Sequence, residues 1–155
     1  MTVTQSLDLV IRVAADRRDA AALALAGSRR QVEAARRKLE MLSRYLQEYL
    51  ARTNGGMQAG GTDPVRVANT RAFIDKLDQA ILQQQAEVAT CDTHAAGCLR
   101  DLTARETTLK SLETLRERRA DEARRDESRR EQKRTDEFGA RAARNGGATL
   151  DFRPA

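Results

Sequence analysis

Apolar residues recur every three or four positions along two long segments of this chain. In the first segment, residues 7–49, thirteen positions follow this spacing and only Arg18 and Ser28 among them are not apolar. This first seam consists of Leu7, Ile11, Ala14, Arg18, Ala21, Leu25, Ser28, Val32, Ala35, Leu39, Leu42, Leu46 and Tyr49. A repeat of about 3.5 residues sustained over this length predicts a long helix that packs against another helix.

A second seam of the same kind occupies residues 74–112. Its members are Ile74, Leu77, Ile81, Gln84, Val88, Cys91, Ala95, Cys98, Leu102, Arg105, Leu109 and Leu112. Between the seams lies a stretch with four glycines in residues 53–62, which is typical of a loop. Asp63 and Pro64 then have the residue types of a helix N-cap and a first helical position, and Asn145-Gly146-Gly147 is typical of a helix end. We therefore expect helix one at about 5–52, a Gly-rich loop at 53–63, helix two at about 64–144, and a flexible tail at 145–155.

The two seams end at matching distances from the loop. Folding the chain back at about residue 60 places Leu7 opposite about residue 113, close to the last position of the second seam, and Ile11 near residues 108–112. The sequence thus predicts an all-α fold: one long antiparallel two-helix coiled-coil hairpin over residues 1–144, with an overhanging C-terminal helix. Because the largest seam side chains lie near the loop, we expect the loop-proximal third to be the most stable part.

Composition agrees with a two-helix layer and argues against a globular core. Charged residues make up 33% of the chain and aromatic residues 3%, Trp is absent, and the mean hydropathy is −0.66. The chain holds one histidine, His94, in the sequence Cys91-x-x-His94-x-x-x-Cys98. Structural zinc sites need four ligands, whereas Cys91 and Cys98 occupy seam positions where small apolar residues are expected. We therefore expect no metal site, no cofactor, no catalytic residues and no enzymatic activity.

Charge and cysteine content bear on location and partners. The chain shows neither a secretory signal pattern nor a membrane-spanning apolar run, and two cysteines without a signal suggest a reducing, cytoplasmic compartment. The net charge is +5, and residues 116–144 carry eleven basic and eight acidic residues. Because the signs alternate along this segment, we expect ion pairs such as Asp121/Arg125 along a single helix, no basic stripe that tracks phosphates, and no nucleic-acid partner.

Three of the five aromatic residues lie near the loop. Tyr45 and Tyr49 are one helical turn apart, as are Phe73 and Leu77. We define the edge cluster by its six members: Leu42, Tyr45, Tyr49, Phe73, Leu77 and Ala80. A pair of helices cannot cover both edges of such a cluster, so partly exposed aromatic side chains there indicate a partner-binding patch. The alternative, that they only widen the packed seam, is equally compatible with the sequence.

Three groups of residues resemble the FliJ family of flagellar type III export proteins. They are Leu42-Ser43-Arg44-Tyr45-Leu46-Gln47-Glu48-Tyr49, then Asn69-Thr70-Arg71-Ala72-Phe73 with Leu77, Ala80-Ile81 and Gln84, and finally residues 131–138 with Arg141. The resemblance runs from about Leu7 to Arg144. Two differences from the family are the absence of Trp and a loop richer in glycine.

The resemblance implies a soluble component of the flagellar export apparatus that is a helical hairpin. Family members act as a stalk in the export ATPase ring, contact the membrane protein of the export gate, and escort export chaperones. The edge cluster would be the partner-binding surface, and the chain would be a monomer when free. Its location would be cytoplasmic and, through its partners, peripheral at the cytoplasmic face of the inner membrane. Two alternatives stay open: a self-associating structural coiled coil, and a basic helix that binds nucleic acid.

Overall fold

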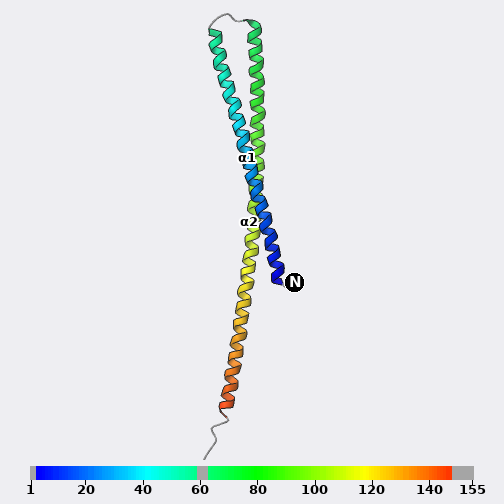
Figure 1. Ribbon diagram of the computed structural model, residues 1–155, viewed down its shortest axis with the longest axis vertical. Coiled ribbons are helices and arrows are strands. Elements are labelled where there is room, and N and C mark those ends of the chain that lie inside the picture. The colour runs from blue at the N-terminus through cyan, green and yellow to red at the C-terminus, as the bar shows by residue number, and fades with distance from the viewer. Residues whose placement is uncertain (1–2, 59–62, 148–155) are drawn as a thin grey trace, which may run out of the picture. The chain divides into compact units, whose positions relative to one another are not determined.

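A computed structural model describes residues 3–58 and 63–147, which form two α-helices. Helix α1 spans Val3–Gln58 and helix α2 spans Pro64–Gly146 (Figure 1). The two long helices pack against each other, so the predicted all-α hairpin is confirmed. The chain divides into two compact units: one is Val13–Thr108, and the other combines the first twelve residues with Leu109 and the residues that follow it. No helix in the described ranges is long and apolar enough to cross a membrane.

Helix α2 begins at the predicted residue and ends two residues beyond its expected end at about residue 144. The backbone N–H of Val65 donates to the Asp63 carboxylate at 3.0 Å, and the N–H of Val67 donates to the Asp63 carbonyl at 3.1 Å. Asp63 is thus the N-cap, and Pro64 occupies the first helical position, where its missing N–H costs nothing. At the other end, the N–H of Gly147 donates to the carbonyl of Ala143 at 3.2 Å. Asn145 and Gly146 therefore belong to α2, while residues 148–155 of the expected tail lie outside the described residues.

Helix α1 continues six residues beyond its expected end. The sequence predicted a loop from residue 53, but α1 runs through Gly55 and Gly56 to Gln58. The hydroxyl of Thr53 donates to the carbonyl of Tyr49 at 2.7 Å, one turn back along the continuing helix. Glycine lowers helix stability by only about 1 kcal/mol relative to alanine, so a helix that is already established can extend through it. Of the predicted loop, residues 59–62 lie outside the described part.

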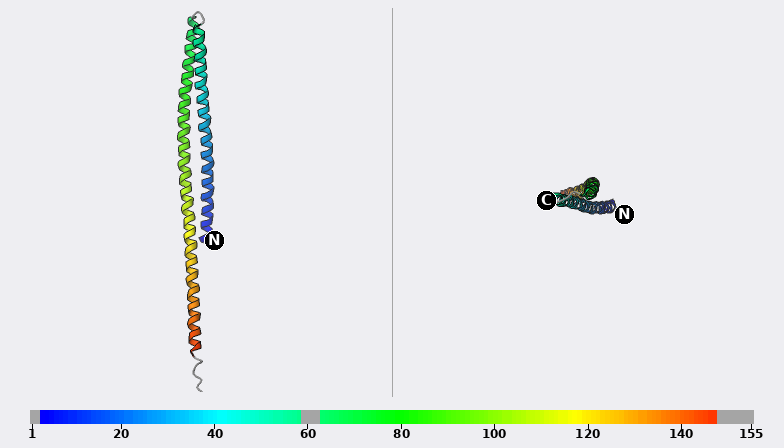
Figure 2. Two further views of the ribbon diagram at one scale, coloured as in Figure 1. Left: turned by 90° about the vertical axis from the view of Figure 1, so that its left-hand side faces the viewer. Right: turned by 90° about the horizontal axis from the view of Figure 1, so that it is seen from above.

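Within the unit Val13–Thr108, the two seams face each other as predicted. The helices run antiparallel and side by side in Figure 1 and in the left view of Figure 2. No seam residue of this unit is exposed. The buried ones are Ala14, Ala21, Leu25, Ser28, Val32, Ala35, Leu77 and Gln84.

Burial in this unit is greatest away from the loop. Leu39, Leu42, Leu46 and Tyr49 are only half-buried, whereas Ala21, Leu25, Val32 and Ala35, further from the loop, are buried. The expectation that this third is the most stable remains a prediction, and the burial pattern gives it no support.

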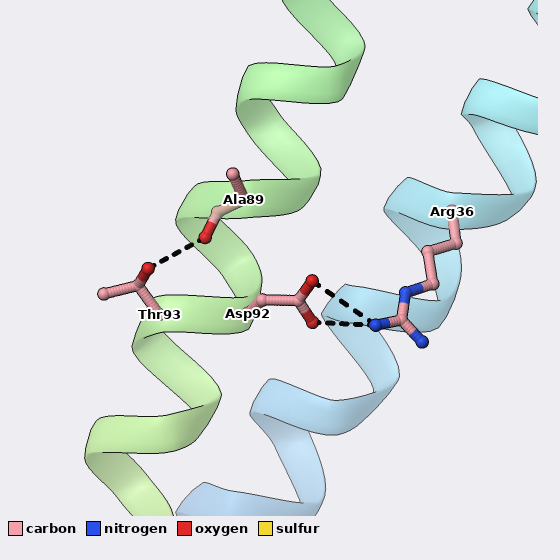
Figure 3. Close-up of polar contacts among 4 residues, drawn as sticks. All are labelled: Arg36, Ala89, Asp92 and Thr93. Atoms are coloured by element: carbon pink, nitrogen blue, oxygen red, sulfur yellow. Dashed lines mark hydrogen bonds and ion pairs between the residues drawn. The ribbon is translucent and has the colours of Figure 1, made fainter.

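Two polar contacts join the helices within this unit. The side-chain amide of Gln84 donates to the backbone carbonyl of Ala35 at 3.0 Å, and both residues are buried. About two helical turns further along α2, one guanidinium nitrogen of Arg36 donates to both carboxylate oxygens of Asp92, at 3.0 and 3.3 Å (Figure 3). Since that ion pair is exposed, it contributes only about 0–1 kcal/mol. The buried Gln84 bond is the more specific register contact.

The second unit contains the N-terminal turns of α1 and the C-terminal part of α2. Leu7, Ile11 and Leu109 are buried there. Asp8 on α1 lies 3.8 Å from Arg116 on α2. This ion pair agrees with the expected register to within about one helical turn. From residue 115 to residue 147 every residue is exposed. Ion pairs one helical turn apart occur there, as expected, but with other partners: Asp121 pairs with Arg124 and Asp126 with Arg129, whereas the expected pair Asp121/Arg125 is not formed.

Candidate partner-binding surface

The aromatic members of the edge cluster meet across the two helices. Tyr45 and Tyr49 lie one turn apart on α1, and both face Phe73 on α2. The ring centroids of Tyr49 and Phe73 are 4.6 Å apart at an interplanar angle of 51°, and those of Tyr45 and Phe73 are 6.3 Å apart at 77°. Edge-to-face pairs of this kind contribute about 0.5–1.5 kcal/mol beyond area burial. The three rings therefore form one interhelical cluster, as their spacing predicted.

The members of the edge cluster differ in how accessible they are. The side chain of Tyr45 is the most open, with a residue exposure of 47%, whereas Leu77 retains only 8%. The other four members, Leu42, Tyr49, Phe73 and Ala80, are half-buried. In the free chain a partner can thus reach Tyr45 and the outer parts of Tyr49 and Phe73. Leu77 lies one helical turn from Phe73 and is buried in the seam.

An open groove extends the edge cluster along the hairpin. It has a volume of about 660 Å³ and shares Leu42 and Ala80 with the cluster. The other lining residues are Gln31, Ala34, Ala35, Lys38, Gln83, Gln84, Glu87 and Cys91. Small side chains line its floor, and Lys38 on α1 and Glu87 on α2 place opposite charges along it. This groove was not predicted from the sequence. The alanines where the edge cluster ends were the feature of the sequence that could have indicated it.

A second, smaller groove lies on the other edge of the seam near the loop. It has a volume of about 290 Å³ and is lined by Leu50, Thr53, Asn54, Val67, Thr70, Arg71, Ile74 and Asp75. It shares no residue with the edge cluster. Leu50 follows Tyr49 directly in sequence and so points about 100° away from it around α1. The loop-proximal end therefore has an accessible surface on both edges, as expected for a pair of helices.

The cysteines and the histidine interact only in pairs along α2. The Cys91 thiol donates to the Glu87 carboxylate at 3.8 Å, and the Cys98 sulfur lies 3.7 Å from Nε2 of His94. Loss of solvent around the thiol raises the pKa of Cys91, and the nearby negative charge of Glu87 raises it further. Among the described residues, no group of three or more His, Cys, Asp or Glu side chains is arranged to hold a metal ion.

Comparison with known proteins matches nearly the whole chain to one family. A family model described as "Flagellar FliJ protein" matches residues 4–148. The "Flagellar FliJ protein" of Escherichia coli (strain K12) is similar to this chain, with 35% identity over 125 residues. That alignment covers 81% of this chain and 84% of the Escherichia coli protein.

Proposed function

The chain belongs to the FliJ family of flagellar proteins, and we propose that it is a component of the flagellar type III protein export apparatus. In this proposal it acts as a stalk in the export ATPase ring, contacts the export gate membrane protein, and escorts export chaperones. It works in the cytoplasm and reaches the cytoplasmic face of the inner membrane through these partners. It is a monomer when free and has no catalytic role.

The observation that carries this proposal is the partly exposed aromatic surface of the edge cluster. Aromatic side chains supply most of the binding energy in many protein interfaces because they bury a large area with few rotatable bonds. Tyr45 is 47% exposed although its ring lies against Phe73. The contact within the chain orients the ring, and the open face stays available to a partner. Such a preorganised side chain loses little conformational entropy when it binds.

The groove beside the edge cluster supports binding to a protein rather than to a small molecule. It is open along its length and is continuous with the cluster through Leu42 and Ala80. Small-molecule sites are enclosed cavities with a few convergent polar groups. An open groove between two helices, floored by alanines, instead suits a segment of another polypeptide.

The decisive experiment measures binding to the isolated export ATPase, the cytoplasmic part of the export gate protein, and an export chaperone. The variant is Tyr45→Ala with Phe73→Ala, which removes the two rings and keeps the buried Leu77. Truncation of two such anchors is expected to weaken binding of at least one partner about thirtyfold or more. Circular dichroism of the same sample must show that the helices persist.

The matched control truncates exposed apolar side chains outside the edge cluster. Leu23 is 74% exposed on α1 and Leu82 is 64% exposed on α2. Leu23→Ala with Leu82→Ala therefore removes comparable apolar surface from both helices and should bind like the unmodified chain. If the aromatic variant keeps both its helicity and its affinity for all three partners, the proposed surface is wrong.

Sedimentation of the purified chain tests the competing assignment. A stalk should sediment as a monomer at micromolar concentration. Stable dimers at that concentration would favour a self-associating structural coiled coil, in which a second copy covers the edge cluster.

A further inference from the structure

Positive and negative charges are distributed unequally around the exposed part of α2. Along the sequence the signs of residues 116–144 alternate, which predicted that no basic stripe would form. The structure makes this segment a continuous helix with every residue exposed, so each residue advances about 100° around the axis. At that angle, ten of the eleven basic residues fall within one half of the helix surface. This basic face comprises Arg116, Arg118, Arg119, Arg125, Arg129, Arg130, Lys133, Arg134, Arg141 and Arg144.

The acidic residues divide equally between the two halves. Glu122, Asp126, Asp136 and Glu137 lie within the basic face, which leaves it a surplus of six positive charges. The opposite half holds Glu117, Asp121, Glu127 and Glu131, with Arg124 as its one basic residue. Arg124 pairs with Asp121. The expectation of no basic stripe is therefore wrong for the folded helix, because alternation along the chain does not produce alternation around it.

Most cations of the basic face have no partner within the described part of the chain. Arg129 lies 4.0 Å from Asp126, and Arg116 lies 3.8 Å from Asp8. The other eight make no ion pair among the residues that the structure describes. Their charges are compensated only by solvent and counterions, so an anionic surface can replace those counterions.

We propose that the basic face binds the anionic phospholipid headgroups of a membrane surface, with this part of α2 lying along the surface. Nine of the ten cations are guanidinium groups, which form paired hydrogen bonds with phosphate oxygens. The face extends over about 28 residues, or about 42 Å of helix, which matches a flat surface rather than a pocket. This inference does not rest on the proposed export function, because it requires only the helix and the lipid.

The chemistry of the face favours lipid over an acidic protein. Its only apolar residues are Ala123, Ala140 and Ala143. Protein interfaces are usually anchored by large apolar side chains at their centre, whereas an anionic bilayer attracts a basic segment through charge alone. Phe138 is 75% exposed but lies outside the basic face, about 40° beyond its nearer edge. It would not insert into a surface that this face contacts.

The test is co-sedimentation of the full chain with vesicles. Vesicles of equal parts phosphatidylglycerol and phosphatidylcholine should bind the chain at low salt, and pure phosphatidylcholine vesicles should not. Binding should weaken steeply as salt rises, because the attraction is screened. A bound fraction that is equal for the two lipid compositions would overturn the proposal.

A charge-removal variant of the basic face tests which surface binds the vesicles. Arg125→Gln, Arg129→Gln, Arg130→Gln and Lys133→Gln reduce the surplus of the face from six to two and leave the opposite half unchanged. Each basic residue near an anionic surface strengthens binding about fivefold, so this variant should bind vesicles at least about tenfold more weakly. A variant that retains its helix content and binds like the unmodified chain would refute the assignment to this face.

A matched control removes four positive charges elsewhere. Arg17, Arg29, Arg30 and Arg37 are exposed on α1 and make no ion pair among the described residues, so changing all four to Gln alters net charge without touching the basic face. This control should bind vesicles within about threefold of the unmodified chain, since distant charges are screened. A loss as large as that of the basic-face variant, which removes the same number of positive charges, would show that overall charge governs binding and would overturn the proposal. Retention of double-stranded DNA at the same salt without retention of vesicles would assign the face to nucleic acid instead.

Discussion

Gln84→Leu is expected to stabilise the hairpin while weakening its preference for one register. Gln84 is 7% exposed in a seam whose other members, apart from Arg105, are apolar, and its side-chain amide donates to the Ala35 carbonyl at 3.0 Å. That carbonyl lies within continuous helix, where it also accepts the hydrogen bond of the residue four positions on. Losing the side-chain hydrogen bond therefore leaves no backbone polar group unpaired. By itself this loss lowers the free energy of unfolding by about 0.5–1.5 kcal/mol.

Burial of the leucine side chain contributes more stability than loss of the Gln84 hydrogen bond removes. Leucine is close to glutamine in volume, and burying its side chain contributes about 1.5–3 kcal/mol. The difference predicts a free energy of unfolding higher by about 0.5–2 kcal/mol for Gln84→Leu. Gln84→Ala removes the same bond but leaves a gap, so it should lower the free energy of unfolding by about 1–2 kcal/mol.

Chemical denaturation monitored by helical circular dichroism measures the stability changes of Gln84→Leu and Gln84→Ala. Sedimentation measures whether the number of associated chains changes as well. A single polar residue in a coiled-coil seam commonly fixes register and number of chains at some cost in stability. The Leu variant should therefore form dimers at concentrations where the unmodified chain is monomeric. A Gln84→Leu variant that is less stable by more than about 1 kcal/mol would show that the hydrogen bond contributes net stability, and the reasoning would fail.

Three further outcomes are expected. Gly55→Ala with Gly56→Ala should stabilise the chain by about 1–2 kcal/mol, because both positions are helical and an added Cβ would meet no atom within 4 Å. No rise in the thermal midpoint would mean that α1 ends before these glycines. Glu87→Gln should speed alkylation of Cys91 at mildly alkaline pH, since removing the negative charge lowers the raised pKa of the thiol and increases the thiolate fraction. Peptide mass spectrometry after a short exposure to iodoacetamide measures this, and an unchanged rate would contradict the role of Glu87. Backbone amides of residues 115–147 should exchange hydrogen much faster than those between Leu77 and Leu109, because no burial protects them. Equal protection of the two segments would mean that the exposed segment packs on a surface.

The sequence by itself determined which residues face the partner helix. Every position of both seams is buried or half-buried, including the polar exceptions Arg18, Ser28 and Gln84. A long repeat is informative because the helical period is fixed by backbone geometry, so the face of each residue follows from its number. The N-cap at Asp63 was equally predictable, since it depends on a hydrogen bond to a residue only two positions away.

The edge cluster was predictable as a group but not in its accessibility. Helical spacing placed Tyr45, Tyr49 and Phe73 together, whereas the packing of the two helices decided how much of each side chain stays exposed, from 8% for Leu77 to 47% for Tyr45. That packing depends on all the side chains between the helices at once. The groove beside the cluster has the same origin, because its volume is the space that alanines on both helices leave unfilled.

The face that the C-terminal charges share also follows from the sequence, because residues 116–144 were expected to form one helix and its rotation gathers ten basic residues on one half. Reading the signs only along the chain missed this face. Only the folded structure decided where α1 ends. Gly55 and Gly56 suggested a loop, yet the helix passes through them, because extending a formed helix costs far less than starting one. Local patterns thus determined the helices, their facing residues and the charged face of α2, while the accessibility of the edge cluster and the end of α1 depended on long-range packing and cooperativity.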